Sequence, residues 1–252
     1  MPPSPDRMAD GYGDLFVPRY RPMARGDWEL RIMAWGFAPG YWTDSAPVAG
    51  LPVLLRGRDT WMSLTPLEFE SQSIGIRLAR GHVLIFGLGL GWAAAATAAQ
   101  PAVTAVTVVE CEQDVLDLHA ALDPFAQLPT AARAKLRVVE GDAFDFVPER
   151  PVDLLMPDIW QPLVGDGRVE EVRRMQAKVA ADAIYFWGQE LEIARHAVAA
   201  GRGLDDDGIA ATVAGFGLPL TGLDTPGYAE KVAAAARRWM RGRWLTGTAA
   251  PW

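Results

Sequence analysis

The chain has few of the features that mark secreted or metal-binding proteins. It contains a single cysteine, so no internal disulfide can form and we expect a reducing compartment. The N-terminal residues have neither a basic nor an apolar region, so we expect no secretory signal and a cytoplasmic protein. The three histidines stand apart from one another, and no cluster of His, Cys and Asp has the spacing of zinc ligands. We therefore expect no metal site.

Positive charge is also scarce. The 24 Lys and Arg residues against 31 Asp and Glu residues give a net charge of −7, which provides no basic field for nucleic acid or anionic lipid. Residues 82–109 carry no formal charge, but glycines and the Gln100-Pro101 pair interrupt them, so they do not predict a membrane span. We expect no nucleic-acid or membrane partner and a small-molecule substrate, and we leave a homodimer open.

Four regions follow one another along the chain. Residues 1–26 are rich in Pro, Gly and Arg and predict a partly ordered arm. Residues 27–64 contain short apolar runs separated by turn sequences, which predict a small antiparallel sheet. Residues 65–196 form the main domain. Residues 197–252 predict a helical C-terminal extension, with no convincing sixth or seventh strand.

The main domain begins with a helix signal and then alternates between strands and helices. Thr65 as N-cap, Pro66 at the first position and Glu68 at the third predict a helix to about residue 80. Apolar runs predict strands over 82–87, 103–110, 135–142, 152–160 and 183–189, and helices at 91–100, 113–122 and 169–179 lie between them. This alternation predicts an α/β fold with a Rossmann-like, doubly wound parallel sheet.

The strongest local motif is GLGLG, which holds Gly87, Leu88, Gly89 and Gly91 between the first strand of that sheet and a helix. Glycines there let backbone amides approach a ligand closely, and a helix N-terminus favours negative charge. An ordinary tight turn is the alternative. The flanking strand and helix favour the ligand site.

Acidic residues follow the next strands. Glu110 ends the second strand, 19 positions after Gly91, where a carboxylate can accept both ribose hydroxyls of a nucleoside. Asp142 ends the third strand, although a turn aspartate is the alternative there, and Asp158 ends the fourth. Ligands of open α/β sheets bind outside the carboxyl ends of the strands. Trp92 stands where a dinucleotide fingerprint needs a small residue, which weakens the nicotinamide alternative.

These motifs resemble class I S-adenosylmethionine-dependent methyltransferases, in particular the spermidine synthase-like branch, over about residues 61–196. The resemblance implies that the glycine loop holds the methionine end, Glu110 the ribose, and Asp142 with Ala143 the adenine. The full set of cofactor residues that it implies is Gly87, Leu88, Gly89, Gly91, Glu110, Cys111, Asp142, Ala143 and Asp158.

The predicted function is methyl transfer from S-adenosylmethionine to a small-molecule nucleophile. Asp158 is the candidate catalytic base, and holding the methionine ammonium is its alternative role. Aminopropyl transfer is the second hypothesis. It ranks below methyl transfer because aminopropyltransferases carry a second acid where this chain has Gln161-Pro162. A cofactor-binding protein without catalysis is the third.

Three further residues are candidates for substrate binding. Trp160 follows Asp158, Gln189 ends the expected fifth strand, and Gln72 lies on the helix before the first strand together with Glu70 and Ser71. Core packing is the alternative for the aromatic residues, and a solvated helix face for residues 70–72. The run Asp205–Asp207 predicts a solvated turn, and the basic, aromatic segment at 231–244 predicts an amphipathic helix.

Overall fold

The N-terminal region forms an antiparallel sheet, as its turn-separated apolar runs predict. In the computed structural model, which describes residues 14–252, its strands run in the order β1-β2-β3-β4. They are β1 (Met23–Arg25), β2 (Trp28–Ala38), β3 (Ala46–Arg56) and β4 (Asp59–Ser63). The sheet thus begins within the region expected to be an arm, the first half of which lies outside the described residues. Leu15 is buried, and the carbonyl oxygen of Phe16 accepts a bond from Trp92 Nε1.

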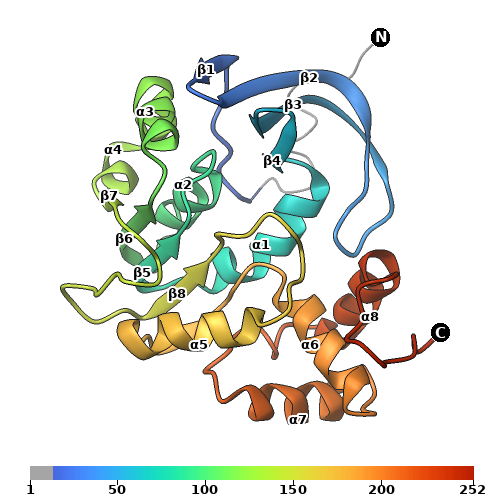
Figure 1. The fold of residues 1–252 in the computed structure, drawn as a ribbon. Coiled ribbons are helices and arrows are strands. Elements are labelled where there is room, and N and C mark those ends of the chain that lie inside the picture. Colours follow the sequence, from blue (N-terminus) through green and yellow to red (C-terminus); the bar gives the residue numbers. More distant parts are fainter. Residues whose placement is uncertain (1–13) are drawn as a thin grey trace.

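The long β2–β3 hairpin crosses the molecule to the C-terminal helices (Figure 1). Near its tip, the Tyr41 carbonyl oxygen accepts a hydrogen bond of 3.0 Å from Trp239 Nε1, and Asp44 forms an ion pair of 2.8 Å with Arg238. The first and last parts of the described chain are therefore joined directly.

The main domain is built on a parallel sheet, which confirms the predicted fold class. Its five strands have the order β7-β6-β5-β8-β9. They are β5 (Gly81–Phe86), β6 (Val103–Glu110), β7 (Leu136–Glu140), β8 (Leu154–Pro157) and β9 (Ala183–Ile184). Chain order reverses between β5 and β8, so the switch point at which such sheets bind ligands lies between the ends of these two strands.

Helices connect and extend these strands. They are α1 (Pro66–Leu78), α2 (Trp92–Ala98), α3 (Gln113–Leu122), α4 (Thr130–Arg133), α5 (Arg168–Val179), α6 (Gln189–Ala199), α7 (Asp206–Phe216) and α8 (Tyr228–Trp239), with a 3₁₀ turn η2 (Pro124–Gln127). The sequence motifs predict α1, α2, α3, α5 and α8. Asp205–Asp207 are exposed as predicted, but they start a helix and do not form a turn, because Asp205 caps α7 by accepting a bond from Gly208 N. No helix within residues 14–252 is long and apolar enough to cross a membrane.

The fifth strand is shorter than the aromatic run 183–189 predicts. After Ile184, Tyr185 N and Trp187 N still donate to the carbonyl oxygens of Leu155 and Pro157 on β8. Gly188 then takes a φ of 81° and starts α6. Beyond β9 the described sheet gains only a parallel bridge between Ile184 and Leu220, in agreement with the expected lack of further strands.

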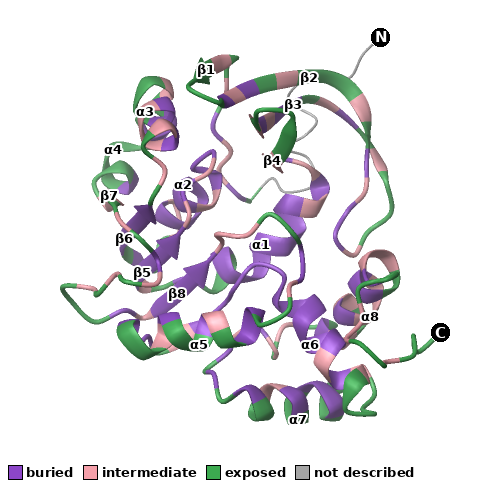
Figure 2. Ribbon diagram, viewed as in Figure 1, coloured by how far each residue is buried: buried purple, intermediate pink, exposed green. Residues whose placement is uncertain are grey.

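The core lies around β5, β6 and β8, whose Val, Ile and Leu side chains are buried as expected for strands covered on both faces (Figure 2). Helix α1 is buried on nearly every side. The solvated face considered for Glu70, Ser71 and Gln72 is therefore wrong. Glu70 accepts bonds from the backbone N–H groups of Trp42 and Thr43, and thereby fixes the tip of the β2–β3 hairpin against α1.

Candidate active site

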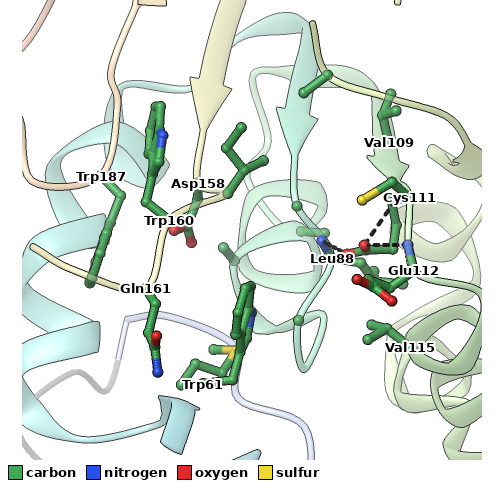
Figure 3. A pocket seen from close by; sticks show the side chains of 18 of the residues that line it. Trp61, Leu88, Val109, Cys111, Glu112, Val115, Asp158, Trp160, Gln161 and Trp187 are labelled. Atoms are coloured by element: carbon green, nitrogen blue, oxygen red, sulfur yellow. Dashed lines mark hydrogen bonds between the residues drawn. The ribbon is translucent and has the colours of Figure 1, made fainter. Parts of the chain in front are cut away.

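A cavity of about 430 Å³ lies at the carboxyl ends of β5, β6, β7 and β8. The two ends of the cavity differ (Figure 3). Cys111, Glu112 and Val115 lie at one end, and Asp158, Trp160 and Trp187 at the other. The predicted residues that line it are Gly87, Leu88, Gly89, Glu110, Cys111, Asp142, Ala143, Asp158 and Trp160.

The glycine loop is shaped by two close approaches. Gly87 has a φ of 95°, and a Cβ there would lie 2.0 Å from the backbone oxygen of Asp158. Gly89 has a φ of 48°, and its Cβ would lie 2.4 Å from Met62 Sδ on β4. Glycine at these positions lets β5 and β8 end side by side and lets the N-terminal sheet close over the loop.

Glu110 organises the part of the cavity at the end of β6. Its Oε2 accepts a hydrogen bond of 3.0 Å from Leu88 N, and its Oε1 accepts bonds of 2.9 Å from the backbone N–H groups of Cys111 and Glu112. A carboxylate offers about four acceptor positions, so a place remains for a hydroxyl donor. Glu110 therefore ties the glycine loop to the end of β6 and can still accept a bond from a ligand.

Asp142 is a turn aspartate and also lines the cavity, so both alternatives that the sequence allows hold for it. Its Oδ1 accepts a hydrogen bond of 2.8 Å from Phe144 N, as in a turn aspartate, while the residue lines the cavity beside Ala143. Its other oxygen is available to an amino group. Cys111 also lines the cavity, and partial burial together with Glu110 and Glu112 raises the pKa of its thiol, so the thiol stays protonated at neutral pH.

At the opposite end, two carboxyl groups come together around an amide. Gln72 Nε2 donates a hydrogen bond of 2.7 Å to Asp158 Oδ2. Burial, opposed in part by the Arg168 charge, raises the pKa of Asp158 to about 7. Glu68 is 5% exposed and lines the same cavity, and burial together with the Asp158 charge raises its pKa well above the usual range.

Glu68 is a site residue that the sequence does not mark as one. It sits at the third position of α1, where the sequence predicts a helix start, but the Thr65 side chain makes no capping bond. Glu68 and Gln72 are four residues apart and share one face of α1. Only the packing of α1 against the end of β8 brings them to Asp158, a contact that no local pattern contains.

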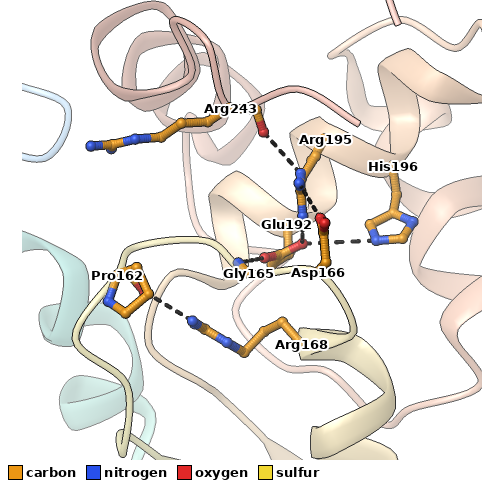
Figure 4. A network of polar contacts seen from close by, with 8 residues as sticks. All are labelled: Pro162, Gly165, Asp166, Arg168, Glu192, Arg195, His196 and Arg243. Carbon is orange, nitrogen blue, oxygen red and sulfur yellow. Dashed lines mark hydrogen bonds and ion pairs between the residues drawn. The ribbon is translucent and has the colours of Figure 1, made fainter. Parts of the chain in front are cut away.

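The loop between β8 and α5 forms the wall beyond Asp158, and a buried polar network fixes it (Figure 4). Arg168 Nη2 donates to the Pro162 carbonyl oxygen at 2.9 Å, and Gly165 N donates to Glu192 Oε1 at 2.9 Å. The Arg168 guanidinium also lies 4.0 Å from the ring centre of Trp160. Trp160 is held in turn by a bond from its Nε1 to Glu171 Oε2.

The remaining predicted residues lie elsewhere. Gly91 is the N-cap of α2, and a Cβ there would meet the His119 ring. Gln72 reaches the cavity through its bond to Asp158 and does not line it. Gln189 is fully buried and donates to Thr221 O and Tyr228 Oη, because the turn at Gly188 directs it toward α8. The next residue, Glu190, is likewise buried. Within the described chain, no group of three acidic, His or Cys side chains could hold a metal ion.

Comparisons with known proteins give structural matches only. No protein-family model and no curated protein matches the chain. Among solved structures, the glycopeptide N-methyltransferase MtfA with S-adenosyl-L-homocysteine is 20% identical, with a TM-score of 0.33, over 44% of this chain and 41% of that chain. The methyltransferase domain of bacterial CtHen1 is 13% identical, with a TM-score of 0.35, over 46% and 64%. CalS10, an amino pentose methyltransferase from Micromonospora echinaspora, is 20% identical, with a TM-score of 0.30, over 45% and 43%. The match spans less than half the length of MtfA and CalS10.

Proposed function

We propose that the protein is an S-adenosylmethionine-dependent methyltransferase that acts on a small-molecule nucleophile. The observation that carries this proposal is the meeting of four strand ends at one cavity beside the switch point of the sheet. In this proposal Glu110 accepts the ribose hydroxyls, and Asp142 with Ala143 contacts the adenine. The glycine loop holds the methionine end.

The shape of the cavity argues against a dinucleotide. Trp92 begins α2, where a pyrophosphate would need a small residue, and its indole is nearly fully buried against Phe69 with ring centres 4.7 Å apart. Leu90 N already donates to Met62 Sδ. Little room remains for phosphate oxygens at this turn, whereas a ligand without phosphates needs none.

Asp158 is the proposed base. The bound cofactor supplies a methyl group already activated by its sulfonium, so the protein has to align the nucleophile and accept its proton. A group with a pKa of about 7 suits proton transfer near neutral pH, and desolvation in the cavity wall gives Asp158 that value. Clamping the methionine ammonium is the alternative role. The variant Asp158→Asn separates the two roles, because loss of the base lowers turnover whereas loss of the clamp lowers cofactor affinity.

Aminopropyl transfer is the second candidate function, and Glu68 is the observation that favours it. The sequence offers one acid at the fourth strand end, but the structure brings a second carboxyl to Asp158 from α1. Product analysis separates the two reactions. Methyl transfer releases S-adenosylhomocysteine, whereas aminopropyl transfer from decarboxylated S-adenosylmethionine releases methylthioadenosine. Formation of methylthioadenosine alone would replace the first proposal by the second.

A further inference from the structure

Glu68 is a buried acid that lines the cavity and is not among the residues proposed to bind the cofactor. It lies close enough to Asp158 for the charges of the two carboxyl groups to interact. An acid this deeply buried destabilises the fold unless it is paired or neutralised. The described lining of the cavity contains five carboxyl groups and no Lys, Arg or His. No basic side chain of the lining can therefore pair with Glu68. The charged groups that face Glu68 and Asp158 from other elements are Glu110 on β6 and Arg168 on α5.

The wall around the Asp158 end of the cavity is aromatic. Trp61, Trp160 and Trp187 line it (Figure 3). Trp187 is fixed by a bond of 3.0 Å from its Nε1 to Ser71 Oγ, and Trp61 packs edge-on against Trp28 with ring centres 5.3 Å apart. Indole faces attract cations and also bury apolar groups. Arg168 already covers one face of Trp160, which leaves that ring as an apolar wall.

We propose that the methyl acceptor is a monoamine with an apolar body, and that Glu68 binds its ammonium group. The inference rests on the proposed methyl transfer and adds the chemical class of the acceptor. An acidic cavity whose described lining has no Lys, Arg or His disfavours anionic acceptors, and the aromatic wall matches an apolar body. With Asp158 reserved for proton transfer, Glu68 is the carboxyl group left beside it to pair with charge, which fits one ammonium group and disfavours a diamine.

Methyl transfer to this amine needs one proton acceptor, and Asp158 can serve as that acceptor. The amine enters as an ammonium ion, as amines with an ordinary pKa near 10 do at neutral pH. Asp158 accepts one N–H proton and frees the nitrogen lone pair. That pair forms the N–C bond to the methyl carbon while the C–S bond breaks and its electrons pass to sulfur, which becomes a neutral thioether. The methylated ammonium stays paired with Glu68 until it leaves.

The test measures binding to the S-adenosylhomocysteine complex by calorimetry. The probes are phenethylamine and hexylamine, their matched alcohols 2-phenylethanol and hexanol, their matched acids phenylacetate and hexanoate, and the diamine putrescine. We expect at least one monoamine to bind roughly tenfold or more tightly than its alcohol and its acid, the usual worth of a hydrogen bond to a charged group. Tighter binding of an alcohol, an acid or putrescine, or binding of no monoamine, would overturn the inference.

The variant Glu68→Gln removes the charge and keeps the shape. We expect it to abolish the preference for the amine over the alcohol, and we expect Glu68→Asp to restore part of it. Glu112→Gln removes one charge from the opposite end of the same cavity and is the matched control, for which the amine preference should persist. Protonated Glu68 should also release a proton when the ammonium binds, visible as a dependence of the binding enthalpy on the buffer, and Glu68→Gln should lose this release.

The outcomes separate this inference from the function beneath it. If S-adenosylhomocysteine binds and no monoamine is preferred, the acceptor class is wrong and methyl transfer stands. If S-adenosylhomocysteine does not bind to the wild-type protein, the proposed function itself fails. If Glu68→Gln does not fold, the comparison of amine with alcohol on the wild-type protein still decides.

Discussion

Two carboxyl groups in this protein have the same raised pKa in very different surroundings. Burial raises the pKa of both Asp158 and Glu190 to about 7. Asp158 lies in the wall of a cavity and has a bond from Gln72. Glu190, at the start of α6, is fully buried. Its Oε1 lies 2.9 Å from Tyr185 Oη, and the hydroxyls of Tyr41 and Tyr228 lie close by.

The difference teaches that a shifted pKa reports desolvation, and that access for a ligand decides function. Tyr185 Oη also lies 2.9 Å from the Ser71 carbonyl oxygen. A neutral Glu190 can donate to Tyr185, which then donates to Ser71, so the cluster joins α6 to α1. Glu190 is therefore a structural acid, whereas Asp158 faces space that a substrate can enter.

The largest effect is expected for Asp158→Asn, because asparagine keeps the shape but accepts no proton. Turnover should fall by roughly 10²–10⁴-fold, the usual worth of general base catalysis, while affinity for S-adenosylmethionine holds nearly steady. Steady-state kinetics and calorimetry measure the two quantities. The matched variant Glu190→Gln should leave both unchanged. A loss of affinity in Asp158→Asn would assign the ammonium clamp, and full activity would remove Asp158 from the site.

The next effect concerns the cofactor end. Glu110→Ala should weaken S-adenosylhomocysteine binding at least tenfold, since bonds to a charged group contribute roughly 1.5–3 kcal/mol each and the carboxylate also fixes Leu88 N. Glu149→Ala is the control, because Glu149 is exposed, paired with Arg137 and not part of the cavity lining. Titration calorimetry should show a much smaller change there. Equal affinities for Glu110→Ala and wild type would mean that the ribose lies elsewhere.

The third prediction tests Glu190 through stability. Its pKa is about 7 in the folded protein against about 4.3 in an unfolded chain, so between these values the folded state holds more protons. Stability should therefore fall as pH rises from 4.3 to 7, by at most about 1.4 kcal/mol per pH unit for this group. Urea unfolding of Glu190→Gln at pH 5, 6, 7 and 8 should show a shallower slope. An unchanged slope would mean that Glu190 is ionised throughout.

The smallest effect is expected for Gln161→Ala. Gln161 Nε2 donates a bond of 2.9 Å to the Thr60 carbonyl oxygen and thereby links the wall beyond Asp158 to β4. A single hydrogen bond contributes roughly 0.5–1.5 kcal/mol, so KM for the acceptor should rise about two- to tenfold with little change in kcat. A large loss of kcat instead would show that this link positions Asp158 itself.

The sheet was predictable because its signals are local. Buried β-branched runs such as 103–110, which follows a proline and ends in an acid, predict strands from local sequence alone, and β6 occupies the predicted residues. Helix α7 was missed because its small residues carry no strong apolar period and its acidic start resembles a solvated turn.

The candidate site contains some residues that local sequence signals predict and others that only tertiary packing brings there. Gly87, Glu110 and Asp158 follow strands, so their meeting at one edge follows from the topology alone. Glu68 comes near Asp158 only through the packing of α1, and Gln189 points away from the cavity because of the turn at Gly188. Neither contact has a signal in a single sequence.

The central claim is that the cavity at the strand ends holds the cofactor of methyl transfer. The most direct measurement is calorimetric titration of the wild-type protein with S-adenosylhomocysteine, NAD and methylthioadenosine. The account predicts binding of S-adenosylhomocysteine at one site and no binding of NAD. Binding of NAD without S-adenosylhomocysteine would contradict it.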